Sequence, residues 1–250
     1  MTTKLLSAFG AGVIATAAFG GAAVAQDKLE FSANIGATSD YIFRGTSQSA
    51  EDPAVFGGFD ATYGMFYAGV WASNVDFVLG PDEGPDDGDA SIEVDFYAGI
   101  APSYMGVDFD LGVIYYAYPG GDDAPDAELD YVEIKGGAST TIQKFSVGGT
   151  VYYSPEYTGE VGPTVATELS LGYELPKTWI FTPSITGLVG AIYFEDDSSL
   201  DYFWWNAGLE LAVENITLDF RYHDTDLAEA TSPIFSGDER FVFTASVSLP

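Results

Sequence analysis

The sequence contains no cysteine, a single histidine and few basic residues. The lack of cysteine excludes a disulfide framework, a thiolate metal site and a thiol nucleophile. Lysine and arginine number 8 against 38 acidic residues, for a formal net charge of −30, which argues against nucleic acid as a partner. The hydrophobic content of 47% excludes a disordered chain, because so many apolar side chains require an ordered environment.

Long hydrophobic runs are absent after the first 25 residues. Lys4 precedes an apolar stretch ending in Ala23-Val24-Ala25, a pattern that predicts a secretory signal peptide over 1–25 with cleavage before Gln26. A transmembrane helix is the alternative, but the stretch is rich in alanine and glycine and has no basic stop-transfer flank. No later segment reaches about 18 consecutive apolar residues, so a membrane span within 26–250 must be made of strands. The length of 26–250 predicts a single domain.

Alternation of apolar and polar residues runs through the chain from Leu29 onward. In the first segment Leu29, Phe31 and Ile35 lie on one face, with Glu30 and Ser32 on the other. The same period of two recurs over 91–100, 107–115, 168–175, 203–211, 216–222 and 241–249, with less regular runs near 54–62, 65–77, 129–141, 145–154 and 179–194. About twelve strands of roughly nine to fifteen residues exceed the usual length in soluble sheets and suit tilted membrane crossings.

The connections between these strands alternate between long and short. The long, mostly acidic connections are 45–53, 78–89, 119–128, 155–162, 195–199 and 225–238, and the tight turns are 63–64, 104–106, 143–144, 176–177 and 214–215. Outer-membrane barrels have an even number of strands, short periplasmic turns and long outer loops. The sequence therefore predicts an all-β fold, an antiparallel transmembrane β-barrel that is exported through the periplasm to the outer membrane and has acidic extracellular loops.

Aromatic residues gather near the ends of the predicted strands, where barrels carry two interfacial girdles. The alternative is that aromatic residues simply favour strands. The candidates at the loop ends are Tyr41, Phe43, Tyr115, Tyr118, Tyr153, Tyr193, Phe194 and Tyr222, and those at the turn ends are Phe31, Phe145, Trp179 and Phe181.

Long and specific motifs occur within the first 120 residues: SDYIFRGTSQ (39–48), DPAV (52–55) with GGFD (57–60), FYAGVWASNVDF (66–77) and EVDFYAG (93–99). They resemble the TorF family of porins, the Gcw_chp group of conserved hypothetical outer-membrane proteins of Gram-negative bacteria. Later residues resemble the family in pattern and length only. The resemblance implies an outer-membrane barrel and a porin. One departure is the ending Ser248-Leu249-Pro250, because many barrels end in an aromatic residue that the outer-membrane assembly machinery, an expected partner, recognises.

Turning the polar faces of the strands inward predicts a lumen rich in carboxylates. Either water fills this lumen and makes a pore, or Arg44, Lys135 and Arg221 bridge opposing carboxylates and make a plug. The carboxylate excess favours a pore for small hydrophilic, preferentially cationic solutes, and the alternative is a non-conducting structural or interaction barrel. The predicted pore-lining residues are Asp40, Arg44, Glu93, Asp95, Asp108, Asp110, Glu168, Glu210, Asp219 and Arg221, joined on the same faces by Glu133, Lys135, Glu174 and His223.

Arg44 is the most distinctive of these residues, because it lies at the predicted end of the first strand inside the longest motif. One interpretation places it in a constriction opposite carboxylates. The other is an ion pair with Asp40 within the barrel wall.

Metal binding and catalysis have weaker support in the sequence. The loop carboxylates lack the spaced D-x-D-x-D-G pattern of a calcium loop, so no metal site is predicted, although divalent ions can bridge such loops to lipopolysaccharide phosphate. No cofactor is implied. Some outer-membrane proteases place an Asp-His dyad opposite two carboxylates across the barrel mouth, and His223 with Glu93 and Asp95 resembles this arrangement. However, Arg221 occupies the position, two residues before the histidine, where those proteases have the aspartate, although Asp224 is adjacent. No G-x-S-x-G or His-x-Ser motif occurs, so the sequence predicts no enzyme.

A soluble periplasmic β-protein, such as a lipocalin-like cup, is a further alternative. Its apolar faces would have to point inward. The opposite faces are so rich in tyrosine, glycine and carboxylate that the assignment with apolar faces outward is simpler.

Overall fold

The computed structural model describes residues 28–77, 90–121, 128–227 and 237–250. The predicted signal peptide lies outside these residues, as do the acidic segments 78–89 and 122–127 and most of 225–238. In the described part of the chain, no helix is long and apolar enough to cross a membrane.

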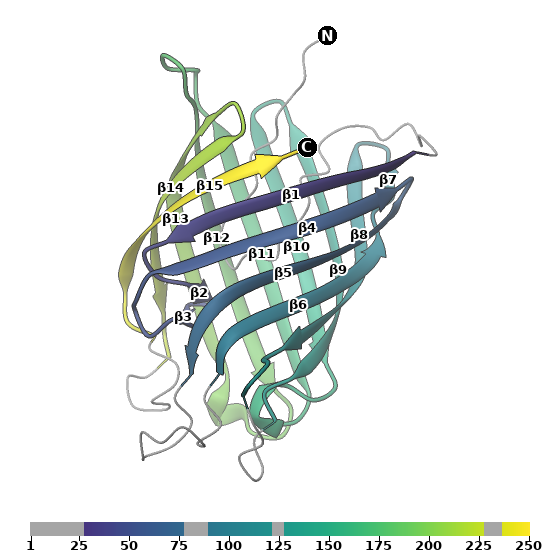
Figure 1. The fold of residues 1–250 in the computed structure, drawn as a ribbon, viewed down its shortest axis with the longest axis vertical. Helices are drawn as coiled ribbons and strands as arrows, with labels where there is room; N and C mark the ends of the chain where they lie inside the picture. The colour runs from purple at the N-terminus through teal and green to yellow at the C-terminus, as the bar shows by residue number, and fades with distance from the viewer. Residues whose placement is uncertain (1–27, 78–89, 122–127, 228–236) are drawn as a thin grey trace.

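Twelve antiparallel strands form a closed barrel (Figure 1). Each strand pairs with its neighbours in the chain, and the ring closes where Ala33 of the first strand pairs with Leu249 of the last. The predicted barrel and its strand number are confirmed. The strands are β1 (Leu29–Thr38), β4 (Ala54–Tyr63), β5 (Phe66–Phe77), β6 (Ala90–Ile100), β8 (Val107–Ala117), β9 (Tyr131–Ile142), β10 (Phe145–Ser154), β11 (Thr164–Glu174), β12 (Thr182–Phe194), β13 (Tyr202–Val213), β14 (Ile216–Thr225) and β15 (Arg240–Leu249).

Five short elements lie in the described parts of the connections between these strands. They are β2 (Ile42–Phe43), β3 (Thr46–Ser47), β7 (Ser103–Tyr104), η1 (Thr158–Glu160) and η2 (Ser198–Leu200). The two-residue β7 extends the barrel sheet beside β8, whereas β2 and β3 form a separate sheet of their own.

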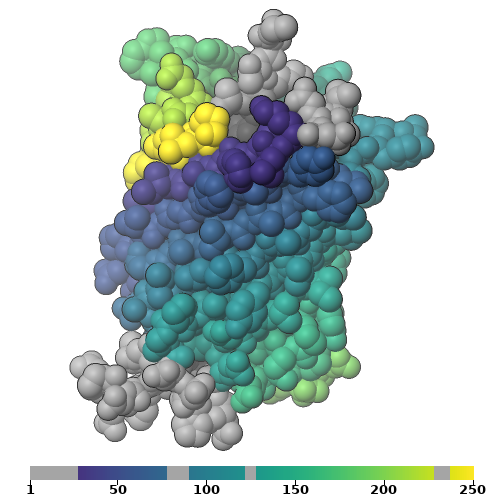
Figure 2. Space-filling view, turned by 45° about the vertical axis from the view of Figure 1, so that its right-hand side comes forward, coloured from purple at the N-terminus to yellow at the C-terminus, as the bar shows by residue number. Residues whose placement is uncertain are grey.

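The apolar faces of the strands point outward and the polar faces point inward. Ile134 and Leu171 are 58% and 59% exposed on the outer wall, whereas Glu93 and Glu210 are buried inside. Figure 2 shows the outer wall as a continuous surface over the purple-to-teal strands. An exposed apolar belt suits lipid and not water. The soluble cup, which requires the reverse orientation, is therefore wrong.

Tight turns join the strands at one end of the barrel, as predicted. Tyr63 pairs with Phe66, Ile142 with Phe145, and Val213 with Ile216, so two residues make each of these turns. Residues with positive φ, Gly64, Gln143 and Glu214, occupy them, as the right-handed twist of hairpin strands requires.

One predicted turn is longer than expected. The connection placed at 176–177 extends from the end of β11 at Glu174 to the start of β12 at Thr182, with a bridge between Thr178 and Phe181. Exposed Trp179 lies within this turn, although the alternation assigned it to a strand. Positive φ at Trp179 breaks the strand conformation there.

The aromatic assignment at the loop end is partly wrong. Tyr115, Tyr153 and Tyr193 lie exposed on the outer wall, whereas Tyr41 and Tyr118 are buried in the lumen. Tyr118 lies just beyond the end of β8 and points inward like Ile114 and Tyr116, because side chains along a strand alternate with a period of two. Tyr41, and Phe43 with it, belong to a segment that leaves the wall after Thr38, so β1 ends before Arg44 and not at it.

Gly190 provides a test of how tightly the lumen is packed. A Cβ on Gly190 of β12 would lie 2.2 Å from Trp204 Cζ2 on the adjacent β13. We expect Gly190→Ala to lower the free energy of unfolding by about 1–3 kcal/mol, because the indole cannot shift freely in a filled lumen. Urea unfolding of the refolded protein in micelles measures this change. Gly149→Ala is the matched control, since its new methyl group meets nothing closer than 3.7 Å; equal losses in both variants would contradict the packing argument.

Candidate functional site

The connection between β1 and β4 folds back into the barrel. Residues 39–53, here termed the lumenal hairpin, carry β2 and β3, which lie inside the ring of strands (Figure 1). These two strands pair only with each other and form a sheet separate from the barrel sheet. The Asp76 N–H donates to the Gln48 carbonyl at 2.8 Å and connects the hairpin to the end of β5. The prediction that 45–53 is an outward-facing loop is therefore wrong for 45–49, which are buried, whereas 50–53 are exposed.

Arg44 and Gly45 form the two-residue tip of the lumenal hairpin. Their φ angles are +48° and +85°, as a type I′ turn requires, and such turns normally carry Asn-Gly. Glycine is needed at the second position, because a Cβ on Gly45 would lie 2.7 Å from Trp204 Cβ. An arginine in the left-handed region is unfavourable by about 1–3 kcal/mol and persists only where its surroundings hold it. The contacts of the Arg44 side chain must therefore offset this strain.

Arg44 reaches across the lumen to β9. Its two terminal nitrogens donate to Glu133 Oε1 and Oε2, each at 2.8 Å, in a bidentate pair. Both residues are buried, and the Arg44 guanidinium lies 4.7 Å from the Phe43 ring centroid and 5.0 Å from that of Tyr152. Burial is the largest single influence and acts to lower the pKa of Arg44, but the charge and hydrogen bonds of Glu133 together with Tyr157 and Tyr116 outweigh it, and the pKa is held above its ordinary value. The guanidinium therefore remains a cation inside the barrel.

Asp40 attaches the base of the lumenal hairpin to β15. Arg240 donates to Asp40 Oδ2 at 2.8 Å, and the hydroxyls of Ser47 and Ser49 donate to Oδ1 at 2.6 and 3.0 Å. The predicted ion pair between Asp40 and Arg44 is wrong, because the inward fold carries the Arg44 side chain away to the far wall. Arg240, absent from the sequence-based site, takes its place.

Tyr41 attaches the hairpin to a third part of the wall, β6. Its hydroxyl donates to Glu93 Oε1 at 2.8 Å. Burial, followed by the charges of Glu93 and Asp95, raises the pKa of Tyr41 well above its ordinary value, so the phenol stays neutral and donates. With Glu133 on β9 and Arg240 on β15, the hairpin is held from sides of the ring that are far apart in the strand order.

Lys135 on β9 bridges to the neighbouring strand. Its Nζ lies 2.6 Å from Asp110 Oδ2 on β8, and Asp110 Oδ1 accepts from the Tyr67 hydroxyl at 2.6 Å. This group lies deeper toward the turn end than the hairpin tip.

Arg221 on β14 bridges the opposite wall. Its Nη2 lies 3.0 Å from Glu210 Oε1 and 2.7 Å from Asp219 Oδ2, and it also donates to Asn206 and Thr186. Arg44 and Lys135 thus each pair with one carboxylate and Arg221 with two, as expected if these bases neutralise carboxylates inside the barrel.

Of the remaining predicted residues, Glu168 and Asp108 also lie on the lumen side. Glu168 on β11 accepts from the Tyr152 hydroxyl at 3.3 Å, and Asp108 accepts from the Ser103 hydroxyl near the turn end. Glu174, at the end of β11, is exposed instead of enclosed.

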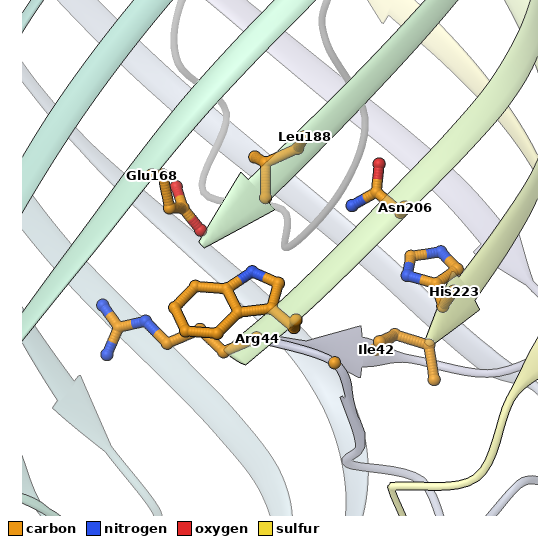
Figure 3. A pocket seen from close by; sticks show the side chains of 8 residues that line it. Ile42, Arg44, Glu168, Leu188, Asn206 and His223 are labelled. Atoms are coloured by element: carbon orange, nitrogen blue, oxygen red, sulfur yellow. The ribbon is translucent and has the colours of Figure 1, made fainter. Parts of the chain in front are cut away.

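A small cavity marks the level at which the hairpin fills the lumen (Figure 3). Its volume is about 10 Å³, room for about one water molecule. The hairpin contributes Ile42, Arg44 and Gly45, and the wall strands contribute Glu168, Leu188, Trp204, Asn206 and His223. The lumen is closely packed on this side, because a Cβ on Gly45 or Gly190 would lie 2.7 or 2.2 Å from Trp204.

The inward-facing neighbours of His223 on β14 and β15 are basic. Arg221 precedes it on the same face, and Arg240 is its register partner on β15. Its register partner on β13, Asn206, accepts from Arg221, so none of these three neighbours offers His223 the carboxylate that orients the histidine of a catalytic triad.

Comparison with known proteins places the chain in a family. The family model described as "Bacterial protein of unknown function (Gcw_chp)" matches residues 22–249. No curated protein matches the chain.

Solved structures with a similar fold are outer-membrane barrels. The KdgM porin in complex with disordered oligogalacturonate matches 88% of this chain and 99% of its own at 6% identity, with a TM-score of 0.52. LpxR from Salmonella typhimurium matches 87% and 99% at 10% identity and a TM-score of 0.45. Outer membrane phospholipase A from Escherichia coli matches 88% and 92% at 11% identity and a TM-score of 0.45. At these sequence identities the similarity to solved structures concerns the fold alone. The match of the family model shows that the chain belongs to the Gcw_chp family of bacterial proteins.

Proposed function

We propose that this protein is an outer-membrane porin that passes small hydrophilic solutes, with a preference for cations, when the lumenal hairpin leaves the lumen. The observation that carries the proposal is the separate two-stranded sheet of the hairpin. Because β2 and β3 share no ladder with the wall, the hairpin can move without breaking the barrel sheet. The described contacts that hold it are mainly side-chain pairs, above all those of Arg44 and Asp40.

The preference for cations follows from the charges that an open lumen exposes. Movement of the hairpin withdraws Arg44 from Glu133 and Tyr41 from Glu93. The wall at this level then carries Glu93, Asp95 and Glu133 without the arginine, and a ring of carboxylates attracts cations into a pore.

The membrane setting of the proposal rests on the exposed apolar belt and on the short turns at one end of the strands. In this orientation the turns face the periplasm, and the acidic connections meet lipopolysaccharide, with divalent ions as bridges. The fold likeness to the KdgM porin and the TorF resemblance support a porin role. We assign no catalytic role, because the inward-facing neighbours of His223 on β14 and β15 are the bases Arg221 and Arg240.

A non-conducting barrel is the competing function, and the tight packing between the hairpin and Trp204 favours it. Planar-bilayer recordings of the refolded wild-type protein separate the two. We expect infrequent openings, because the hairpin is held on several sides, and a reversal potential of cation sign across a KCl gradient.

The recordings need a folded sample, which heat-modifiable migration on a denaturing gel verifies. A folded protein that never opens would support the non-conducting barrel. Openings with an anionic reversal potential would contradict the cation preference and leave the porin role in place.

A further inference from the structure

Asp95 on β6 is a buried carboxylate with no partner for either oxygen. Its side chain is 0% exposed, and neither Oδ1 nor Oδ2 lies within hydrogen-bond distance of a donor. Its register partner on β5 is Trp71, a buried residue whose indole N–H also has no acceptor. A buried carboxylate without a partner is strongly unfavourable, so this position calls for a component that the side chains do not supply.

The charged groups that act on Asp95 are of the same sign. They are Glu93, two positions away on the same face of β6, and Glu133 on β9. Arg44 binds both oxygens of Glu133, and the hydroxyls of Tyr41 and Tyr118 donate to Glu93, so both carboxylates are set up as acceptors. With Asp95 ionised, three carboxylates face one guanidinium, and the group carries a net charge of −2.

Protonation of Asp95 does not resolve this arrangement. A protonated carboxyl is a hydrogen-bond donor and needs an acceptor, and the described residues place none within reach of either oxygen. A water molecule could accept from the protonated carboxyl, but the two remaining carboxylates, Glu93 and Glu133, would still outnumber the one guanidinium and leave a net charge of −1.

We propose that Asp95 and Glu93 form a buried site for a divalent cation of the calcium type beneath the lumenal hairpin, with Glu133 adding charge. Carboxylate oxygens are the ligands such ions prefer, the free oxygens of Asp95 allow bidentate binding, and a charge of +2 balances the group. In the described part of the chain no three carboxylate or imidazole groups converge into a complete cage, so water completes the coordination.

The bound ion also stabilises the closed hairpin. Glu93 receives the Tyr41 hydroxyl, so an ion that fixes Glu93 fixes the attachment of the hairpin to β6. The site does not depend on whether solutes pass through the barrel, because it requires only the closed arrangement.

The test uses the full chain refolded in micelles with and without the ion. Tb³⁺ replaces Ca²⁺ and emits when a nearby tryptophan transfers energy to it, and Trp71 is next to Asp95. We expect tryptophan-excited Tb³⁺ emission that Ca²⁺ displaces, and a rise in Tm when Ca²⁺ is present during refolding. Asp95→Asn should weaken Tb³⁺ binding about tenfold or more and abolish the Ca²⁺-dependent rise in Tm.

Matched variants make each outcome decisive. Asp60→Asn changes another buried lumenal carboxylate, one already paired with the Tyr97 hydroxyl at 2.6 Å, and should keep the full response. Glu93→Gln provides a second test if Asp95→Asn fails to refold, and we expect the same loss. Wild-type Tm unchanged by Ca²⁺, a response to K⁺ alone, or unaltered Tb³⁺ affinity in the folded variants would overturn the proposal.

Discussion

Replacing the lumenal hairpin, residues 39–53, with Asn-Gly is expected to raise the single-channel conductance by about an order of magnitude or more. Thr38 of β1 and Ala54 of β4 are register partners, so a two-residue type I′ turn can join them without altering the barrel sheet. The change removes Arg44 and the neighbouring residues that fill the lumen near Trp204. Planar-bilayer recordings of the refolded variant measure the change.

The control for this variant shortens the described outer connection of 195–199, which carries part of η2 and lies outside the lumen, and its conductance should stay at the wild-type level. Heat-modifiable migration verifies that both variants are folded. A folded hairpin-deletion variant with wild-type current would place the closure elsewhere in the barrel. The result tests where the barrel is closed, while spontaneous opening of the wild-type protein tests the porin function.

The barrel was predictable because its signal is local and repeated. A period of two over each strand fixes which face meets lipid, so the inward placement of Glu93, Glu210 and Asp219 followed from alternation alone. The short turns were also predictable from a local signal. Where only two residues join paired strands, few turn types fit, chiefly types I′ and II′.

The inward fold of the hairpin was not predictable from these signals, because alternation describes strands and says nothing about where a connection goes. The pair of Asp40 and Arg240 joins residues 200 positions apart, and a single sequence gives no means to match them. One signal was available: Thr46, Ser47, Gln48 and Ser49 form an uncharged polar run, unlike the acidic connections, and all four are buried. A connection without surface charge is better suited to an interior than to solvent.

The second large effect concerns Arg44. Arg44→Asn improves the local backbone, because asparagine accepts the left-handed conformation of this turn and relieves about 1 kcal/mol of strain. The same substitution leaves Glu133 buried without its guanidinium, and removing one partner of a buried pair is unfavourable by about 3–5 kcal/mol. The loss of the buried ion pair is larger than the relief of backbone strain, so we expect the docked hairpin to be destabilised by about 2–4 kcal/mol. Hydrogen exchange of the Asp76 amide, which donates to the Gln48 carbonyl at 2.8 Å and so connects β5 to the hairpin, reports the docking.

Combining Arg44→Asn with Glu133→Gln distinguishes the ion pair from the turn. Glu133→Gln alone leaves the guanidinium uncompensated and should also speed exchange, whereas the double variant removes both charges and should recover most of the protection. Glu30→Gln is the control, because its pair with Lys28 is exposed and 3.9 Å apart, and it should leave exchange unchanged. Slower exchange in Arg44→Asn would contradict the argument, since it would mean that turn geometry and not the buried pair sets the stability of the hairpin. The pair would then be a consequence of docking, and its loss would not open the lumen.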